Sequence, residues 1–280
     1  MAHPLIEICV EGIDGFLAAQ AAGADRVELC ASLMEGGLTP SIATIRAAVA
    51  AATIPVHVII RPRGGDFLYS EAEFETMRAD IEALREEGVA GVVIGCLTPD
   101  GRIDEVRTKA LVEAARPMSV TCHRAFDMTA DFAEALEALI RCGVDRVLTS
   151  GQRDTALEGL DILKRSQELA AGRIVIMGCG ALDAENIRAV RDGAGLGELH
   201  FAALRTIPSG MAFRNPHVGM GGTEKDREYE LTITDMDAVR ATIAAARRTP
   251  EHQLRGFAFC AIPEGMRYSG LPFFQVTCSP

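Results

Sequence analysis

The chain has 280 residues, of which 48% are hydrophobic and 24% charged, and its formal net charge is −11. This length and apolar content suit a single large α/β barrel. Without a basic stripe, such an acidic chain is not expected to bind nucleic acid or an anionic membrane surface. A small anionic ligand stays compatible, because it responds to local Arg and His residues and not to net charge.

Cellular location follows from the absence of targeting features. The N-terminal residues lead directly into a predicted strand, without the basic and apolar segments of a signal peptide, and no apolar run is long enough to span a bilayer. Eight cysteines are scattered along the chain, with no Cys/His spacing typical of a zinc site. We expect a cytoplasmic protein without membrane contact, in which most cysteines are small buried hydrophobic residues.

The order of the predicted elements is a β-strand followed by a helix, repeated eight times. Hydrophobic periodicity and turn residues define each segment. The predicted strands are 5–10, 26–31, 55–62, 91–97, 119–127, 146–151, 173–180 and 198–204, and the predicted helices are 12–22, 41–52, 70–87, 104–115, 131–142, 157–170, 183–192 and 234–248.

Eight parallel strands with helical crossovers predict a (β/α)8 TIM-type barrel over residues 1–248. A Gly-Ala/Val-Asp-Arg-Val phrase that starts at Gly23 and again at Gly143 supports an internal quasi-repeat. The alternative is an open Rossmann-like sheet, but no GxGxxG follows the first strand and we expect no nucleotide cofactor. Residues 249–280 are too apolar for a solvated tail, so we expect this extension to pack on the barrel or on a partner subunit.

A Glu-x-Cys pattern occurs at matching positions in the first two strands. Glu7 and Cys9 share one face of the first strand, and Glu28 and Cys30 share one face of the second. A carboxylate inside a sheet is costly unless it is paired or faces a solvated cavity. The repeated pattern therefore predicts a working pocket at the mouth of the barrel, where the C-terminal strand ends meet.

Other strand ends add basic and polar side chains to the same mouth. On the fifth strand, alternation places His123 and Asp127 on one face and Arg124 on the other. Such a mixture can supply general acids or bases and bind an anion. The blander alternatives are packing for the histidines and, for Arg61 and Arg63, a structural salt-bridge lock with Glu7 and Glu28 inside the barrel. The remaining candidates are His57, Arg61, Arg63, Ser150 and His200.

Several ungapped strings resemble the CutC family, which is named for copper homeostasis. They include the sequences ADRVELC at 24–30, EGGLTPS at 35–41, IRPRGGDF at 60–67, HRAFDM at 123–128 and RVLTSGQ at 146–152. The resemblance covers nearly the whole predicted barrel. It implies a cytoplasmic (β/α)8-type barrel that forms a homodimer or a higher homo-oligomer.

The resemblance makes copper homeostasis the first functional hypothesis, with Cys9 and Cys30 as the thiols that bind Cu(I). Soft thiolates suit this ion. The alternative is an isomerase, lyase or aldolase acting on a small anionic metabolite, and a purely structural barrel interior is the third possibility. For the enzyme we expect acid–base roles for Glu7, Glu28, His123 and His200, and substrate binding by Arg61, Arg63, Asp127 and Ser150.

Overall fold

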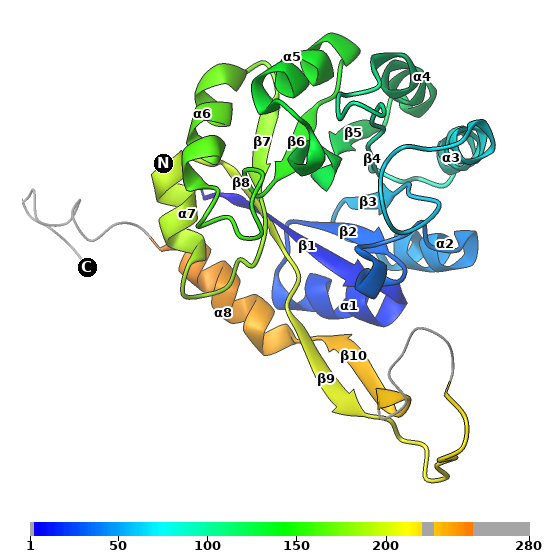
Figure 1. The fold of residues 1–280 in the computed structure, drawn as a ribbon. Coiled ribbons are helices and arrows are strands. Elements are labelled where there is room, and N and C mark those ends of the chain that lie inside the picture. The colour runs from blue at the N-terminus through cyan, green and yellow to red at the C-terminus, as the bar shows by residue number, and fades with distance from the viewer. Residues whose placement is uncertain (1–2, 220–226, 249–280) are drawn as a thin grey trace, which may run out of the picture. The chain divides into compact units, whose positions relative to one another are not determined.

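The computed structural model describes residues 3–219 and 227–248 of the chain. Eight parallel strands, hydrogen-bonded in sequence order from β1 to β8 and back to β1, close into a barrel (Figure 1). The predicted TIM-type barrel is therefore confirmed. Its strands are β1 (Leu5–Glu11), β2 (Arg26–Cys30), β3 (Val56–Ile59), β4 (Gly91–Ile94), β5 (Ser119–Cys122), β6 (Arg146–Thr149), β7 (Val175–Gly178) and β8 (Glu198–Phe201).

Helices surround this barrel, and local sequence fixes where several of them begin and end. The Ser70 hydroxyl and the Glu73 side chain form a capping box at the start of α3. Gly23 and Gly143 adopt left-handed conformations that end α1 and α5. The helices are α1 (Gly12–Ala22), α2 (Ile42–Ala51), α3 (Glu71–Leu84), α4 (Glu105–Ala115), α5 (Phe132–Cys142), α6 (Leu160–Ala170), α7 (Ile187–Ala194) and α8 (Met236–Arg247).

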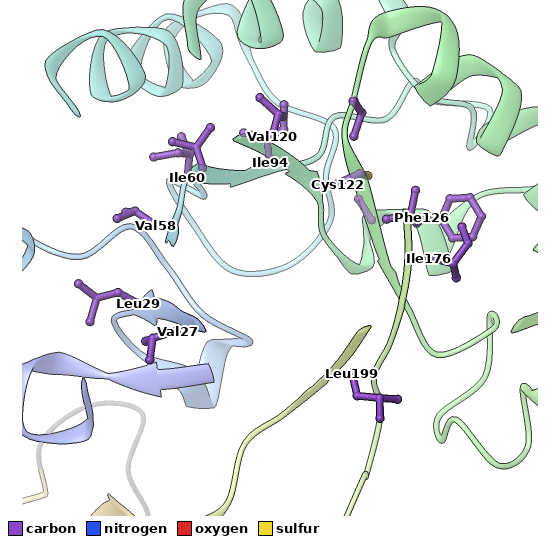
Figure 2. Close-up of a cluster of buried hydrophobic side chains, with 14 of the residues drawn as sticks. Val27, Leu29, Val58, Ile60, Ile94, Val120, Cys122, Phe126, Ile176 and Leu199 are labelled. Atoms are coloured by element: carbon purple, nitrogen blue, oxygen red, sulfur yellow. The ribbon is translucent and has the colours of Figure 1, made fainter. Parts of the chain in front are cut away.

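The main hydrophobic core lies between the strands and the surrounding helices. Figure 2 shows part of it, with aliphatic side chains contributed by successive strands around the barrel. Val27, Leu29 and Val58 are fully or almost fully buried there. Because side chains alternate along a strand, the residues between those of the outer core point into the barrel interior. Glu7, Glu28 and the other charged groups of the candidate site are among these interior residues.

Seven of the eight predicted strands end earlier than expected, and the early ends of β3 and β5 change the directions of candidate site residues. Strand β3 stops at Ile59, before Arg61 and Arg63, and β5 stops at Cys122. Residues Arg124–Met128 form a short 3-10 helix, η2, whose first turn is capped by the His123 ring accepting the Ala125 N–H. The predicted alternation between His123, Arg124 and Asp127 is therefore wrong, because a helical turn replaces the strand at this point.

A two-stranded antiparallel hairpin that was not predicted, β9 (Leu204–Pro208) with β10 (Glu230–Thr234), lies between β8 and α8 in the chain (Figure 1). Both strands are largely exposed, so they lack the alternation of buried and exposed residues on which a prediction depends. Among the described residues, no helix is long and apolar enough to cross a bilayer. The predicted extension 249–280 lies outside the described residues.

A glycine on β4 makes room for one of the interior histidines. A Cβ atom at Gly91 would lie 2.6 Å from Nε2 of His57. We expect Gly91→Ala to reduce the free energy of unfolding by about 1–3 kcal/mol, the usual cost of overpacking. Gly197 is the matched control, because a Cβ atom there meets nothing within 4 Å. Urea unfolding of both variants measures the difference, and equal stabilities would contradict this account.

Candidate functional site

The carboxylate of Glu7 lies at the centre of a buried charge network inside the barrel. Its Oε2 accepts a short hydrogen bond from Nε of Arg26, and its Oε1 lies 2.7 Å from Nδ1 of His200. Burial raises the pKa of Glu7, but the hydrogen bond to His200 and the charge of Arg26 outweigh this and hold that pKa well below its usual range. Glu7 is therefore ionised although only 1% of its surface is exposed.

The network continues toward the N-terminal ends of the strands through two arginines and a second carboxylate. Nη2 of Arg26 lies 2.7 Å from Oε2 of Glu198, and Nε of Arg146 lies 2.6 Å from the same oxygen. Arg146 also makes a second contact of 3.1 Å to Oε1 of Glu198. Glu7 is thus tied through Arg26 and Glu198 to Arg146, with two positive and two negative charges in alternation.

His200 connects this network to the C-terminal mouth. Its Nδ1 bonds to Glu7, and its Nε2 lies 3.7 Å from Oε2 of Glu28. Burial lowers the pKa of His200, but hydrogen bonds to Cys9 and Glu7 outweigh burial and raise that pKa well above its usual value. His200 is accordingly an imidazolium at neutral pH.

The thiols of Cys9 and Cys30 lie in contact with each other, and Cys9 also lies beside His200. Their sulfur atoms are 3.6 Å apart, far beyond the length of a disulfide. The hydrogen bond with Cys30 lowers the pKa of Cys9 to about 5 against the effect of burial, and His200 adds to this. The same hydrogen bond, together with burial, raises the pKa of Cys30 well above its usual value. One thiolate and one thiol share the hydrogen bond.

Glu28 completes a group of possible metal ligands. One ligand atom from each of Cys9, Glu28 and Cys30 lies within 4.8 Å of the others, and all three residues are buried. Burial and the nearby Cys9 thiolate raise the pKa of Glu28 well above its usual value. Its Oε1 is buried and has no hydrogen-bond partner within residues 3–219 and 227–248. An unpartnered oxygen beside two thiols fits a site that holds a positively charged, thiophilic ion.

His57 and His123 are buried but lie apart from the thiols. His57 approaches Glu7 at 3.8 Å, and burial lowers the pKa of His57 to about 4. Burial and the charge of Arg61 lower the pKa of His123 to about 3. Nδ1 of His123 accepts from Ala125, so the neutral ring carries its hydrogen on Nε2, which has no partner among the described residues. Both rings are neutral at physiological pH.

Arg61 connects two loops by hydrogen bonds and does not contact Glu7 or Glu28. Its guanidinium donates to the carbonyl oxygens of Glu35 and Gly37 in the loop after β2, and to that of Gly65 in the loop after β3. The side chain also lies over the Phe67 ring at 5.1 Å. Glu7 does form a buried salt bridge inside the barrel, but its partner is Arg26 and not Arg61.

Arg63 lies outside the barrel mouth in the loop that follows β3. It donates to the carboxylates of Glu73 and Asp66 and to the carbonyl oxygens of Gly64, Asp66 and Leu68. These bonds hold the guanidinium against its own loop and the first turn of α3. The structure therefore does not bring Arg63 to the glutamates and thiols.

Asp127 and Ser150 form a second network at the ends of β5 and β6. The Asp127 carboxylate accepts from the backbone N–H groups of Ser150 and Gln152, from the hydroxyls of Thr149 and Ser150, and from Nε of Arg124. Its two oxygens are fully engaged within the protein. The network thus positions Arg124, which the sequence analysis had placed on the opposite face.

The structure therefore brings together five of the predicted site residues, namely Glu7, Cys9, Glu28, Cys30 and His200, while the roles assigned to them stay predictions. Sequence reasoning missed Arg26 and Glu198. Each of these residues precedes a predicted site residue by two positions, in Arg26-x-Glu28 and Glu198-x-His200. The same alternation that identified Glu28 places both on the interior face, so the pattern contained them.

Comparison with known proteins agrees with this architecture. The model of the CutC family matches residues 4–205. The chain belongs to the CutC family. It is 67% identical to the family protein CutC of Mesorhizobium japonicum over 87% of this chain and 95% of that protein. It is 46% identical to the copper homeostasis protein cutC homolog of Homo sapiens, over 87% of this chain and 89% of that protein.

A solved CutC structure confirms the fold within the family. The crystal structure of CutC from Streptococcus agalactiae superimposes with a TM-score of 0.67 at 32% identity. The match covers 71% of this chain and 98% of that chain. The resemblance stated from the sequence is therefore confirmed.

Removing the charge at the centre of the network is expected to destabilise this CutC-family barrel strongly. Glu7→Gln leaves the buried His200 imidazolium without its counter-ion, which costs about 3 kcal/mol or more. Glu87→Gln is the control, since Glu87 pairs with the exposed Arg46 and such pairs contribute at most about 1 kcal/mol. Denaturant unfolding measures both losses. A loss no larger than that of the control would show that the Glu7 network does not stabilise the CutC barrel.

The two neutral histidines predict a loss of stability in acid. Their pKa values are lower in the folded CutC chain than in the unfolded chain, so the unfolded state binds more protons below about pH 6.5. Stability should then fall by roughly 1 kcal/mol per pH unit for each histidine as the pH drops from about 6.5 toward 4. His123→Asn should flatten this dependence by one histidine's share in unfolding experiments from pH 7 to pH 4. An unchanged slope would contradict a neutral His123.

Proposed function

We propose that this protein acts in copper homeostasis by binding Cu(I) through Cys9 and Cys30 at the mouth of the barrel. The observation that carries the proposal is the 3.6 Å separation of the two sulfur atoms on neighbouring strands. At this separation one ion can contact both sulfurs, and soft thiolate ligands favour Cu(I). The human relative is named a copper homeostasis protein homolog, which supports the same function.

The charges around the thiols support a monovalent cation. Cys9 is the more acidic thiol, with a pKa of about 5, so it offers a thiolate at neutral pH. Cys30 keeps its proton in the free protein and releases it on binding a metal, as thiol ligands do. Glu28 is held largely protonated by burial and by Cys9, so it adds no further negative charge to the two thiolates of the loaded site. Two thiolates with one thiophilic ion of single charge leave one negative charge, which the neighbouring His200 imidazolium offsets.

A second candidate function is a TIM-barrel enzyme acting on a small anionic metabolite. The observation that favours it is His200, which contacts both Glu7 and Glu28 and lines a cavity of about 300 Å³ at the mouth. Two thiols suffice for copper, so this further set of ionisable groups supplies a general acid and base that copper binding does not require. In this alternative Glu28 and His200 transfer protons and Glu7 orients His200.

We further propose that the protein works in the cytoplasm as a homodimer or higher homo-oligomer. The cysteines of the described part of the chain are free thiols, which fits a reducing compartment. Exposed Leu231 and Phe213, on and next to the hairpin, fit an apolar contact between copies. Light scattering after size exclusion measures the assembly.

Anaerobic titration of Cu(I) against a competing chelator tests the copper site. We expect tight binding by the wild type and a loss of more than about 100-fold in affinity for Cys9→Ser and for Cys30→Ser, since even outer-shell changes around a metal cost 10–100-fold. Cys142→Ser is the matched control, because this thiol lies at the end of α5 and contacts the carbonyl of Glu105. Weak binding by the wild type, or tight binding that neither substitution affects, would overturn the thiol site.

A further inference from the structure

A cavity of about 300 Å³ opens at the C-terminal mouth, directly above the thiols and the histidine of the charge network. Cys9 and His200 form part of its wall, and Arg124 lies in the wall contributed by η2. The loop after β7 provides another part through Gly180 and Leu182. This volume is at the small end of the range for ligand pockets, so it suits a small metabolite.

The loop after β7 lines this cavity and contains backbone N–H groups without a partner in the described part of the chain. Gly180 has φ of 104° and Ala181 has φ of 51°, so the chain turns through two left-handed residues in succession. The N–H groups of Gly180, Ala181 and Leu182 make no hydrogen bond to any of the residues 3–219 and 227–248. Consecutive N–H groups in such a turn form a concave site for an anion.

The neighbouring loop after β6 shows how such donors are used in this same barrel. There, the N–H groups of Ser150 and Gln152 donate to the carboxylate of Asp127, and the Ser150 hydroxyl adds a further bond. Gln152 also has a positive φ, of 55°. One βα loop therefore holds an internal carboxylate with its backbone, while the next has equivalent donors and no internal partner among the described residues.

Arg124 supplies the positive charge that an anion needs. Asp127 fixes Nε of its guanidinium, and Nη2 donates to the Ser150 hydroxyl and to the Arg153 carbonyl. Nη1 has no hydrogen-bond partner in the described part of the chain, and the side chain is about half exposed. Asp127 is thus a positioning residue that orients Arg124 beside the cavity.

From these donors we infer that the mouth holds an oxyanion of a small ligand, a phosphate or a carboxylate group, between Arg124 and the N–H groups of Gly180, Ala181 and Leu182. The remainder of the ligand then lies over Cys9 and His200. This site is separate from the Arg61 and Arg63 clamp expected from the sequence, and copper binding does not require it. The backbone donors and Nη1 of Arg124, whose Nε alone is taken up by Asp127, favour an anion over a neutral molecule.

Titration of the copper-free protein with inorganic phosphate and, separately, with acetate tests the site. Amide resonances in ¹H–¹⁵N spectra report where each anion binds, and sodium chloride at equal ionic strength controls for screening. We expect saturable shifts of the Gly180, Ala181 and Leu182 amides with phosphate, acetate or both, and the tighter of the two anions identifies the ligand group. Cys30→Ser should bind the anion as the wild type does, because Cys30 belongs to the thiol pair but does not line the cavity, which separates this result from the fate of the copper site.

Arg124→Gln and Arg153→Gln complete the experiment. The first substitution removes the charge and should weaken anion binding by about tenfold or more, as expected for a charge-assisted hydrogen bond. Arg153 serves as the matched control on the loop after β6, because its guanidinium bonds the carbonyl of Gln152 and does not line the cavity. If Arg124→Gln does not fold, the wild-type amide shifts still decide. Shifts no larger than those with chloride, shifts confined to other loops, or equal affinities in the two variants would overturn the inference.

Discussion

The barrel interior depends on one buried carboxylate that remains charged. Glu7 is enclosed on β1, and it stays ionised because Arg26 on one side and His200 on the other neutralise it. Removing any one member would leave the others as uncompensated buried charges, which is the costly state for a low-dielectric interior. His200 stays an imidazolium partly because of Glu7, and through His200 the arrangement adds to the acidity of Cys9.

Alternation along the strands explains how far the sequence could predict this site. Glu7, Glu28 and His200 lie on interior faces because the opposite faces of their strands form the outer core, and the binary pattern contains that information. Arg26 and Glu198 were equally accessible to the same reasoning. The 3.6 Å contact between Cys9 and Cys30 was not, since it depends on the register of β1 against β2, where Cys9 is paired with Glu28 and Cys30 with Glu11.

Beyond the strand ends the pattern loses its predictive power. Arg61 and Arg63 follow β3, and their directions are set by carbonyl groups of loops that no periodicity describes. At β5, the helical turn from Arg124 brings that side chain and Asp127 to the same network, which an extended strand would have kept on opposite faces. Where backbone hydrogen bonding gives way to side-chain capping, residue parity no longer defines the face.

The mouth of the barrel therefore has paired charges below it and, above it, hydrogen-bond donors that have no partner in the described part of the chain. Below the mouth, the charges of the Glu7 network are paired with one another. In the loop after β6, backbone N–H groups already donate to the Asp127 carboxylate. Above the mouth, the loop after β7 and Arg124 line a cavity whose wall includes Cys9, and both keep hydrogen-bond donors without a partner among the described residues. An anion bound there would lie against the thiol pair. A ligand of this kind would therefore determine which species, metal or metabolite, can reach Cys9, so the two candidate functions share one entrance.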